Sequence, residues 1–227
     1  MVPSRCEPLT LDIPGSTPVS ALWLCPDRAI ASFVMAHGAG AGMRHAFLEG
    51  VAQQLAAKNV ATLRYQFPYM EHASRRPDTP AVCHAAVRAA VTEAGRRSAV
   101  PLFAGGKSFG GRMTSQAQAE NPLPGVKGLV FLGFPLHPAK QPSDKRAEHL
   151  VDVRIPLLFL QGTRDGLAEV NLLEPVVQRL GQRASLRWFD AADHSFHVPA
   201  RSGRNDAQVM DELVAVLAGW LTGLAFE

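Results

Sequence analysis

Ser108, Asp165 and His194 are three residues whose types could together activate a hydroxyl group for nucleophilic attack. A serine needs a general base to take its proton, and the base needs an acid that holds its tautomer and stabilises the imidazolium that forms. Each of the three follows a short apolar run that is typical of a buried strand. Because active residues of parallel sheets gather at the carboxyl ends of the strands, we expect these side chains to meet there.

Ser108 lies between two glycines, Gly106 and Gly110, in the sequence Gly-Lys-Ser-Phe-Gly. A strand, a glycine-flanked serine and the start of a helix form the context of a G-x-S-x-G nucleophile elbow. The tight turn would press a Cβ at either flanking position against neighbouring backbone, and glycine has no Cβ. The pattern predicts that Ser108 stands exposed at the edge of the sheet as a nucleophile.

Two other interpretations of this stretch compete with the elbow. Gly106-Lys107-Ser108 matches the end of a phosphate-binding loop, but that loop requires a glycine five residues before Gly106, where the chain has Pro101. The stretch could also be a glycine-rich turn with an incidental serine, since G-x-S-x-G occurs by chance. The assignment of Ser108 therefore depends on its partners.

Other aspartates compete with Asp165 for the role of the acid. Asp165 alone is equally consistent with capping of a turn or of the helix predicted after it. Asp190 and Asp193 are nearer to His194 in sequence. The order Ser, Asp, His that accompanies this elbow nevertheless favours Asp165.

His197 is a second candidate for the base. His194 is preferred because it lies closer to the end of the preceding strand, where a short loop can place it over the serine. Asp193, His194 and His197 could instead bind a metal, but the sequence has no further ligand cluster to complete such a site. We expect no metal and no cofactor, since the reaction requires neither.

Two backbone N–H groups are needed to stabilise a developing oxyanion. One is expected from Phe109, the residue after the nucleophile, and the other from the loop after the third predicted strand. The sequence HGAGAG at 37–42 occupies that loop, and Ala39 is the candidate donor. The glycines of this stretch could alternatively form a dinucleotide-binding fingerprint. Two features disfavour that interpretation: the third glycine comes one residue early, and the next strand ends without the acidic residue that would bind the ribose.

The elements around these motifs predict a mostly parallel sheet. An antiparallel hairpin is expected from 9–13 and 19–24. Further strands are expected at 31–36, 60–65, 101–105, 126–133, 156–161 and 184–189, and helices at 46–58, 79–97, 109–119, 169–180 and 206–221. Apolar strands that alternate with helices require helices on both faces of the sheet. The length of 227 residues, 47% of them hydrophobic, predicts one domain over 1–227.

Charge and cysteine content narrow the class of partner and the compartment. The 23 basic and 20 acidic residues give a net charge of +3 without a long basic run, which argues against nucleic acid. Cys6, Cys25 and Cys83 form no C-x-x-C pair, so free thiols in a reducing compartment are expected. Residues 1–7 lack an apolar h-region, and no uninterrupted apolar run approaches the ~18 residues that span a bilayer. We predict a cytoplasmic protein that binds no membrane.

Four motifs together resemble a known family. They are HGAG at 37–40, GKSFGG at 106–111, GTRD at 162–165 and DHSF at 193–196. The chain resembles the small α/β-hydrolases of the dienelactone hydrolase-like group, and is similar to a bacterial branch related to testis-expressed and KANSL-type hydrolase-like proteins. The resemblance covers nearly the whole chain and implies a single-domain α/β-hydrolase fold. Dienelactone hydrolase uses a cysteine nucleophile where this chain has Ser108, so the resemblance implies a serine hydrolase but not lactone hydrolysis.

The remaining residues bear on the substrate. The irregular segment 135–154 is too short for a substantial lid, which predicts an open site for small esters or the exposed end of a larger acylated molecule. Lys107 and Arg112 flank the nucleophile and could favour an anionic substrate, although Lys107 could equally face solvent. Expected pocket walls are Met43, His45, Tyr69, Phe109, Phe134 and Leu167.

The predicted function is that of a serine hydrolase that cleaves carboxylic esters or thioesters of small molecules. One alternative is a non-catalytic binding or scaffold protein with this fold, because fold does not fix function. A small serine peptidase is another. The chain is expected to act as a monomer or a homodimer.

Overall fold

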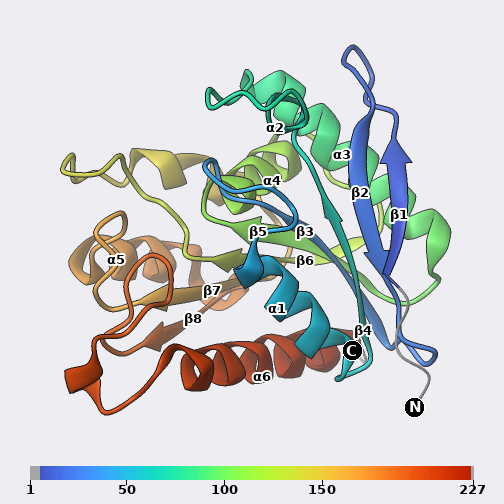
Figure 1. Cartoon of the computed structure of the whole chain (residues 1–227). Helices are drawn as coiled ribbons and strands as arrows, with labels where there is room; N and C mark the ends of the chain where they lie inside the picture. The colour runs from blue at the N-terminus through green and yellow to red at the C-terminus, as the bar shows by residue number, and fades with distance from the viewer. Residues whose placement is uncertain (1–5, 226–227) are drawn as a thin grey trace.

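An eight-stranded sheet runs through the molecule (Figure 1). The computed structural model describes residues 6–225, and its strands are β1 (Cys6–Leu11), β2 (Val19–Leu24), β3 (Ala31–Ala36), β4 (Val60–Tyr65), β5 (Leu102–Lys107), β6 (Val126–Leu132), β7 (Leu157–Gly162) and β8 (Ala184–Phe189). Their order in the sheet is β1-β2-β4-β3-β5-β6-β7-β8. β2 is antiparallel to β1 and β4, and all other neighbours are parallel. The predicted mostly parallel sheet with an N-terminal hairpin is confirmed.

Helices cover both faces of this sheet, as predicted (Figure 1). The α-helices are α1 (Ala46–Ala56), α2 (Pro68–Glu71), α3 (Pro80–Arg97), α4 (Phe109–Glu120), α5 (Val170–Leu180) and α6 (Asp206–Ala225). Short 3-10 helices are η1 (Lys145–Asp152), η2 (Gly181–Arg183) and η3 (Ala200–Ser202). α1 and α6 pack on one face, and α3, α4 and α5 pack on the other. The sheet therefore separates two apolar cores.

β3 shows how a central strand of this sheet is covered on both of its faces. Phe33 and Met35 point into the core under α1 and α6, whereas Val34 and Ala36 point into the core under α3 and α4. All six residues of β3 are buried. A parallel strand covered on both sides is expected to be apolar along its whole length, and β3 has this pattern except at the buried Ser32.

Among the strands and α-helices, the sequence prediction misplaces β1 and misses α2, and the other elements differ by a few residues at their ends, as α6 does by reaching Ala225. β1 spans Cys6–Leu11 rather than 9–13, because Leu11 pairs with Val19 and the chain then enters the turn. Ile13 is buried but lies beyond that last pair, so its apolar side chain extended the predicted strand. α2 was not predicted, since four residues are too few to show helical periodicity.

The segment between β6 and β7 contains the 3-10 helix η1, and the structure describes no α-helix there. This agrees with the expectation that residues 135–154 form no substantial lid. α6 is long and apolar enough to cross a membrane by length and composition alone, a test that core helices also pass. Its residues Val209, Leu213 and Leu217 pack in the core beneath the sheet. Residues 1–5 and 226–227 of the predicted domain, including most of the stretch that lacks an h-region, lie outside the described residues.

The start of α4 approaches β3 very closely at Gly110. A Cβ built on Gly110 would lie 2.5 Å from the backbone oxygen of His37 and 2.7 Å from the carbonyl carbon of Ala36. These neighbours are main-chain atoms of the central sheet and cannot move aside cheaply. Gly110 therefore sets how near the first turn of α4 lies to the end of β3.

We predict that two Gly→Ala changes, both within α-helices, shift stability in opposite directions. Gly110→Ala should lower the free energy of unfolding by roughly 2 kcal/mol or more, because the new methyl group overlaps backbone. Gly219→Ala on α6 meets nothing within 4 Å and should raise it by roughly 0.5–1 kcal/mol. Urea unfolding of both variants measures the difference. Equal effects of the same sign would contradict the close approach.

Candidate active site

Ser108 occupies the sharp turn between β5 and α4. Its backbone has φ 50° and ψ −117°, a conformation that non-glycine residues rarely adopt and that costs of order 1–3 kcal/mol. A Cβ on the preceding Gly106 would lie 2.2 Å from the oxygen of Ala36, so the strand before the turn also presses against β3. The structure thus has the local geometry that the elbow pattern predicts, with Ser108 partly exposed.

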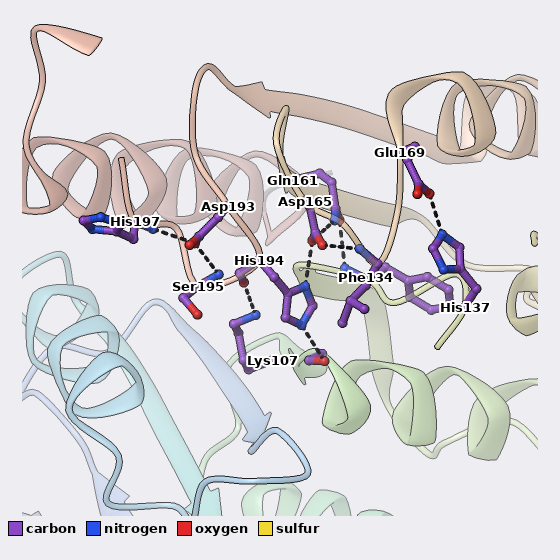
Figure 2. Close-up of polar contacts among 12 residues, drawn as sticks. Lys107, Phe134, His137, Gln161, Asp165, Glu169, Asp193, His194, Ser195 and His197 are labelled. Atoms are coloured by element: carbon purple, nitrogen blue, oxygen red, sulfur yellow. Dashed lines mark hydrogen bonds and ion pairs between the residues drawn. The ribbon is translucent and has the colours of Figure 1, made fainter. Parts of the chain in front are cut away.

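Asp165 and His194 meet Ser108 at the carboxyl ends of the strands. The Nε2 atom of His194 lies 2.8 Å from Oγ of Ser108, and Nδ1 of His194 lies 2.7 Å from Oδ2 of Asp165. Figure 2 shows the side chains of Asp165 and His194 pointing toward one another. Because a carboxylate can only accept, Nδ1 donates to it and Nε2 is left to accept from the serine hydroxyl. The structure therefore brings the three predicted residues together in a single hydrogen-bonded chain.

Gln161, the penultimate residue of β7, holds Asp165 in place. It was not among the site residues predicted from the sequence. Its Oε1 accepts from the backbone N–H of Phe134 at 2.8 Å, so its amide nitrogen must donate to Oδ2 of Asp165 (Figure 2). The other oxygen, Oδ1, accepts from the backbone N–H of Leu167 at 2.8 Å. Asp165 is 2% exposed, and each carboxylate oxygen has a donor. The signal available in the sequence was a single glutamine near the end of an otherwise apolar strand.

The alternative residues in the loop after β8 have other partners. Asp193 accepts from the backbone N–H groups of Ser195 and His197 and so shapes the turn. The exposed side chain of His197 pairs with Asp206 at 2.8 Å. Asp190 accepts from the hydroxyl of Thr163. Residues 6–225 contain no group of three or more side chains that could hold a metal ion.

Lys107 turns inward and supports the His194 loop. Its Nζ donates to the backbone oxygen of His194 at 2.5 Å (Figure 2). The same atom lies 5.6 Å from the centre of the Phe196 ring. Burial lowers the pKa of Lys107 to about 8, against the opposing effect of Asp165 and Asp193. The ammonium group is therefore engaged with the protein.

The loop that contains Ala39 is fixed from both sides. The backbone N–H of Phe67 donates to Nε2 of His37 at 3.0 Å, which leaves Nδ1–H of His37 to donate to the oxygen of Gly38 at 2.8 Å. Burial lowers the pKa of His37 to about 4, so the ring stays neutral and keeps this tautomer. The hydroxyl of Tyr69 donates to the oxygen of Ala39 at 2.9 Å. Since a trans peptide points its N–H opposite to its C=O, the bond to Gly38 also orients the N–H of Ala39.

Two cavities meet at Ala39, Ser108 and Leu167. The histidine cavity has a volume of about 350 Å³ and is lined by Gly38, Ala39, Gly40, Ala41, His45, Phe47, Leu48, Lys107, Ser108, Leu167, His194 and Ser195. The arginine cavity has a volume of about 460 Å³ and is lined by Ala39, Pro77, Asp78, Pro80, Ser108, Phe109, Arg112, Met113, Pro135, Arg146 and Leu167. Ser108 thus lies between two open spaces.

The predicted pocket walls separate into two groups. His45, Phe109 and Leu167 line these cavities, whereas Met43, Tyr69 and Phe134 do not. Phe134 packs between Phe131 and Phe159 in the core, and Tyr69 supports the Ala39 loop from behind. Met43 is 4% exposed. Residues of loops at the catalytic edge were expected to face the cavity, but these three point into the protein.

Three solved structures with a similar fold are described as hydrolases or esterases. A dienelactone hydrolase from Anabaena variabilis is 19% identical, with a TM-score of 0.76 over 96% of this chain and 97% of that one. A serine hydrolase without a lid from Xanthomonas campestris is 21% identical, with a TM-score of 0.73 over 97% of each chain. The esterase domain of a Rhodothermus marinus protein is 16% identical, with a TM-score of 0.72 over 95% of this chain and 97% of that one.

These similarities define the fold as that of the α/β-hydrolases. The family of the chain follows more directly from a match of its sequence. A family model for the alpha/beta hydrolase domain matches residues 29–222. The chain belongs to this family, as its resemblance to small α/β-hydrolases implied. The matched residues include all four motifs on which that resemblance was based.

The buried Lys107 predicts a specific pH dependence of stability. Its pKa is about 8 in the folded protein and near the usual 10.5 when unfolded, so between these values the unfolded chain binds more protons. The contribution of Lys107 to the free energy of unfolding should therefore rise from pH 8 to pH 10.5 and stay constant outside this window. Urea unfolding across that range should give a flatter pH profile for Lys107→Met than for the wild type. Parallel profiles would contradict the burial of the charge.

Proposed function

We propose that this chain is a serine hydrolase with Ser108 as nucleophile, His194 as general base and Asp165 as the residue that orients His194. The observation that supports this most directly is the hydrogen-bonded chain from Ser108 Oγ to His194 Nε2 and from His194 Nδ1 to Asp165. The strained backbone of Ser108 adds to it, because such strain persists where it serves a site.

The reaction follows from this geometry. His194 takes the proton of Ser108 as Oγ attacks the carbonyl carbon of an ester or thioester. Backbone N–H groups of Ala39 and Phe109 stabilise the negative charge that develops on the carbonyl oxygen. The imidazolium of His194 then protonates the departing alcohol or thiol, and an acyl group remains on Ser108. A water molecule, activated by the same histidine, releases the acid and restores the hydroxyl group.

Carboxylic esters and thioesters are the proposed bonds. The segment between β6 and β7 offers only η1 as cover, so small esters or the exposed ends of larger acylated molecules could reach Ser108. Two of the similar solved structures are described as a dienelactone hydrolase and an esterase domain, which favours esters over peptides. A purely structural scaffold would have no need of the buried hydrogen bonds to Asp165.

Replacement of the nucleophile tests the proposal. Ser108→Ala should fold normally and lose hydrolysis of short-chain p-nitrophenyl esters by about 10⁴-fold or more, since the acyl-enzyme cannot form. The wild type should react with a fluorophosphonate, and mass mapping should place the adduct on Ser108. Ser185→Ala, on the exposed face of β8, is the matched control and should keep both properties. Undiminished turnover by purified Ser108→Ala, or no adduct on folded wild type, would reject the assignment and favour the scaffold.

The support of the Ala39 loop gives a separate prediction. Tyr69→Phe removes the hydroxyl that donates to the oxygen of Ala39, so the oxyanion donor becomes less well fixed. We expect kcat to fall about three- to tenfold with little change in KM, the equivalent of one net hydrogen bond in the transition state. Tyr65→Phe removes another buried hydroxyl that makes no hydrogen bond to this loop, and should leave kcat unchanged. A change confined to KM would argue that Tyr69 acts on substrate binding instead.

A further inference from the structure

Two arginines line the arginine cavity, and they reach it from different elements. Arg112 lies one helical turn after the nucleophile on α4, where its backbone N–H donates to the oxygen of Ser108 at 3.1 Å. Its guanidinium group packs over the ring of Phe109, with 5.6 Å between Cζ and the ring centre. Arg146 comes from η1, in the segment between β6 and β7. Both cationic groups therefore border the space next to Ser108.

Neither guanidinium group has a partner within the described part of the chain. Among residues 6–225, Arg112 and Arg146 form no ion pair and no side-chain hydrogen bond, and Nε of Arg112 is fully buried without an acceptor. Burial lowers the pKa of Arg112, and the nearby charge of Arg146 lowers it further, so the two cations are close enough to repel each other. The terminal nitrogens of Arg112 and Arg146 are not fully buried and have no acceptor among the described residues, so they are available to an anionic group that enters the cavity.

Among the described residues, Asp78 is the only acidic one that lines the arginine cavity, and one of its oxygens already has a donor. Its Oδ2 accepts from the backbone N–H of Tyr69 at 2.7 Å. Two arginines and one aspartate leave one positive charge in excess, which matches a group with a single negative charge, such as a carboxylate. In the histidine cavity, by contrast, the cation Lys107 is held by the oxygen of His194.

The position of His194 decides which part of the substrate enters each cavity. The leaving group must receive its proton from Nε2 of His194, so it departs on the side that this residue lines. His194 lines the histidine cavity and not the arginine cavity. The acyl part then extends past Ala39 and Phe109 toward Arg112 and Arg146.

We propose that the arginine cavity binds a carboxylate at the far end of the acyl part of the substrate. The preferred substrates are then monoesters or monothioesters of dicarboxylic acids, and the inference rests on the proposed serine hydrolase function. One water is consumed for each ester bond cleaved, an alcohol or thiol is released, and a dicarboxylate is left. Guanidinium groups suit this task because they present paired donors to the two oxygens of a carboxylate.

A matched pair of esters measures this preference. Mono-4-nitrophenyl adipate has a free carboxylate, and methyl 4-nitrophenyl adipate is its neutral counterpart; the corresponding suberate pair tests a longer acyl chain. Ser108→Ala supplies the rate of spontaneous hydrolysis for each ester. The measured quantity is the ratio of kcat/KM for the anionic ester to that for the neutral ester. We expect a ratio of about ten or more for the wild type with at least one chain length.

Charge-removing variants locate the preference. Arg112→Gln and Arg146→Gln should each lower the ratio about tenfold, because each removes a charged hydrogen bond to the carboxylate. Arg146 lies on a 3-10 helix at the surface, so Arg146→Gln should fold and can test the preference even if Arg112→Gln does not fold. Lys145→Gln is the matched control: it removes an equal charge from the adjacent, exposed residue, which does not line the arginine cavity, and should keep the ratio within about twofold.

The outcomes separate the two proposals. Absence of turnover for every ester, anionic or neutral, would reject the hydrolase function itself. Turnover of the neutral ester with a wild-type ratio of one or less at both chain lengths would overturn only the carboxylate site, as would an equal loss of the ratio in Lys145→Gln. A pair with the charge on the leaving group, 4-acetoxybenzoate and its methyl ester, tests orientation. A stronger anionic preference in that pair would place the carboxylate in the histidine cavity and overturn the inference.

Discussion

The close contact of β5 and α4 with the end of β3 is the constraint on which the rest of the site depends. Gly106 lies against Ala36, and Gly110 lies against His37, at distances that leave no room for a Cβ. With both sides of the turn pressed against the central strand, Ser108 has only a strained conformation in which to connect them. That conformation directs its hydroxyl group out of the sheet edge. The position of the reactive atom is therefore a product of main-chain packing.

The same contact links the nucleophile to the loop that faces it. β3 ends at Ala36, and His37 follows at once, so the strand that confines the elbow also begins the Ala39 loop. A neutral His37 can give its single N–H to Gly38 only because Phe67 donates to its other nitrogen. In a buried setting each of these groups would be costly without its partner. The polar groups beneath the site are thus mutually dependent.

Much of this arrangement could be predicted from sequence because it depends on local patterns. Apolar runs indicated the strands, and glycines two residues either side of Ser108 indicated a turn with no space for side chains. The chain order then placed Asp165 and His194 after strands whose carboxyl ends share an edge. What could not be predicted is the direction of individual side chains in the loops. Tyr69 and Phe134 lie at the expected edge, yet one supports a backbone loop from behind and the other fills the core.

Lys107 and Arg112 show that closeness to the nucleophile in the sequence does not determine what a side chain does. Both cations lie within four residues of Ser108 in the sequence, and from the sequence alone either could bind an anionic substrate. Lys107 ends a central strand, so its side chain must pass through a crowded interior, where the backbone oxygen of His194 accepts from it. Arg112 lies one turn into α4 and lines the arginine cavity. Within the described part of the chain, its Nε has no acceptor. The fold thus uses one charge to support its own loop and leaves the other for a ligand.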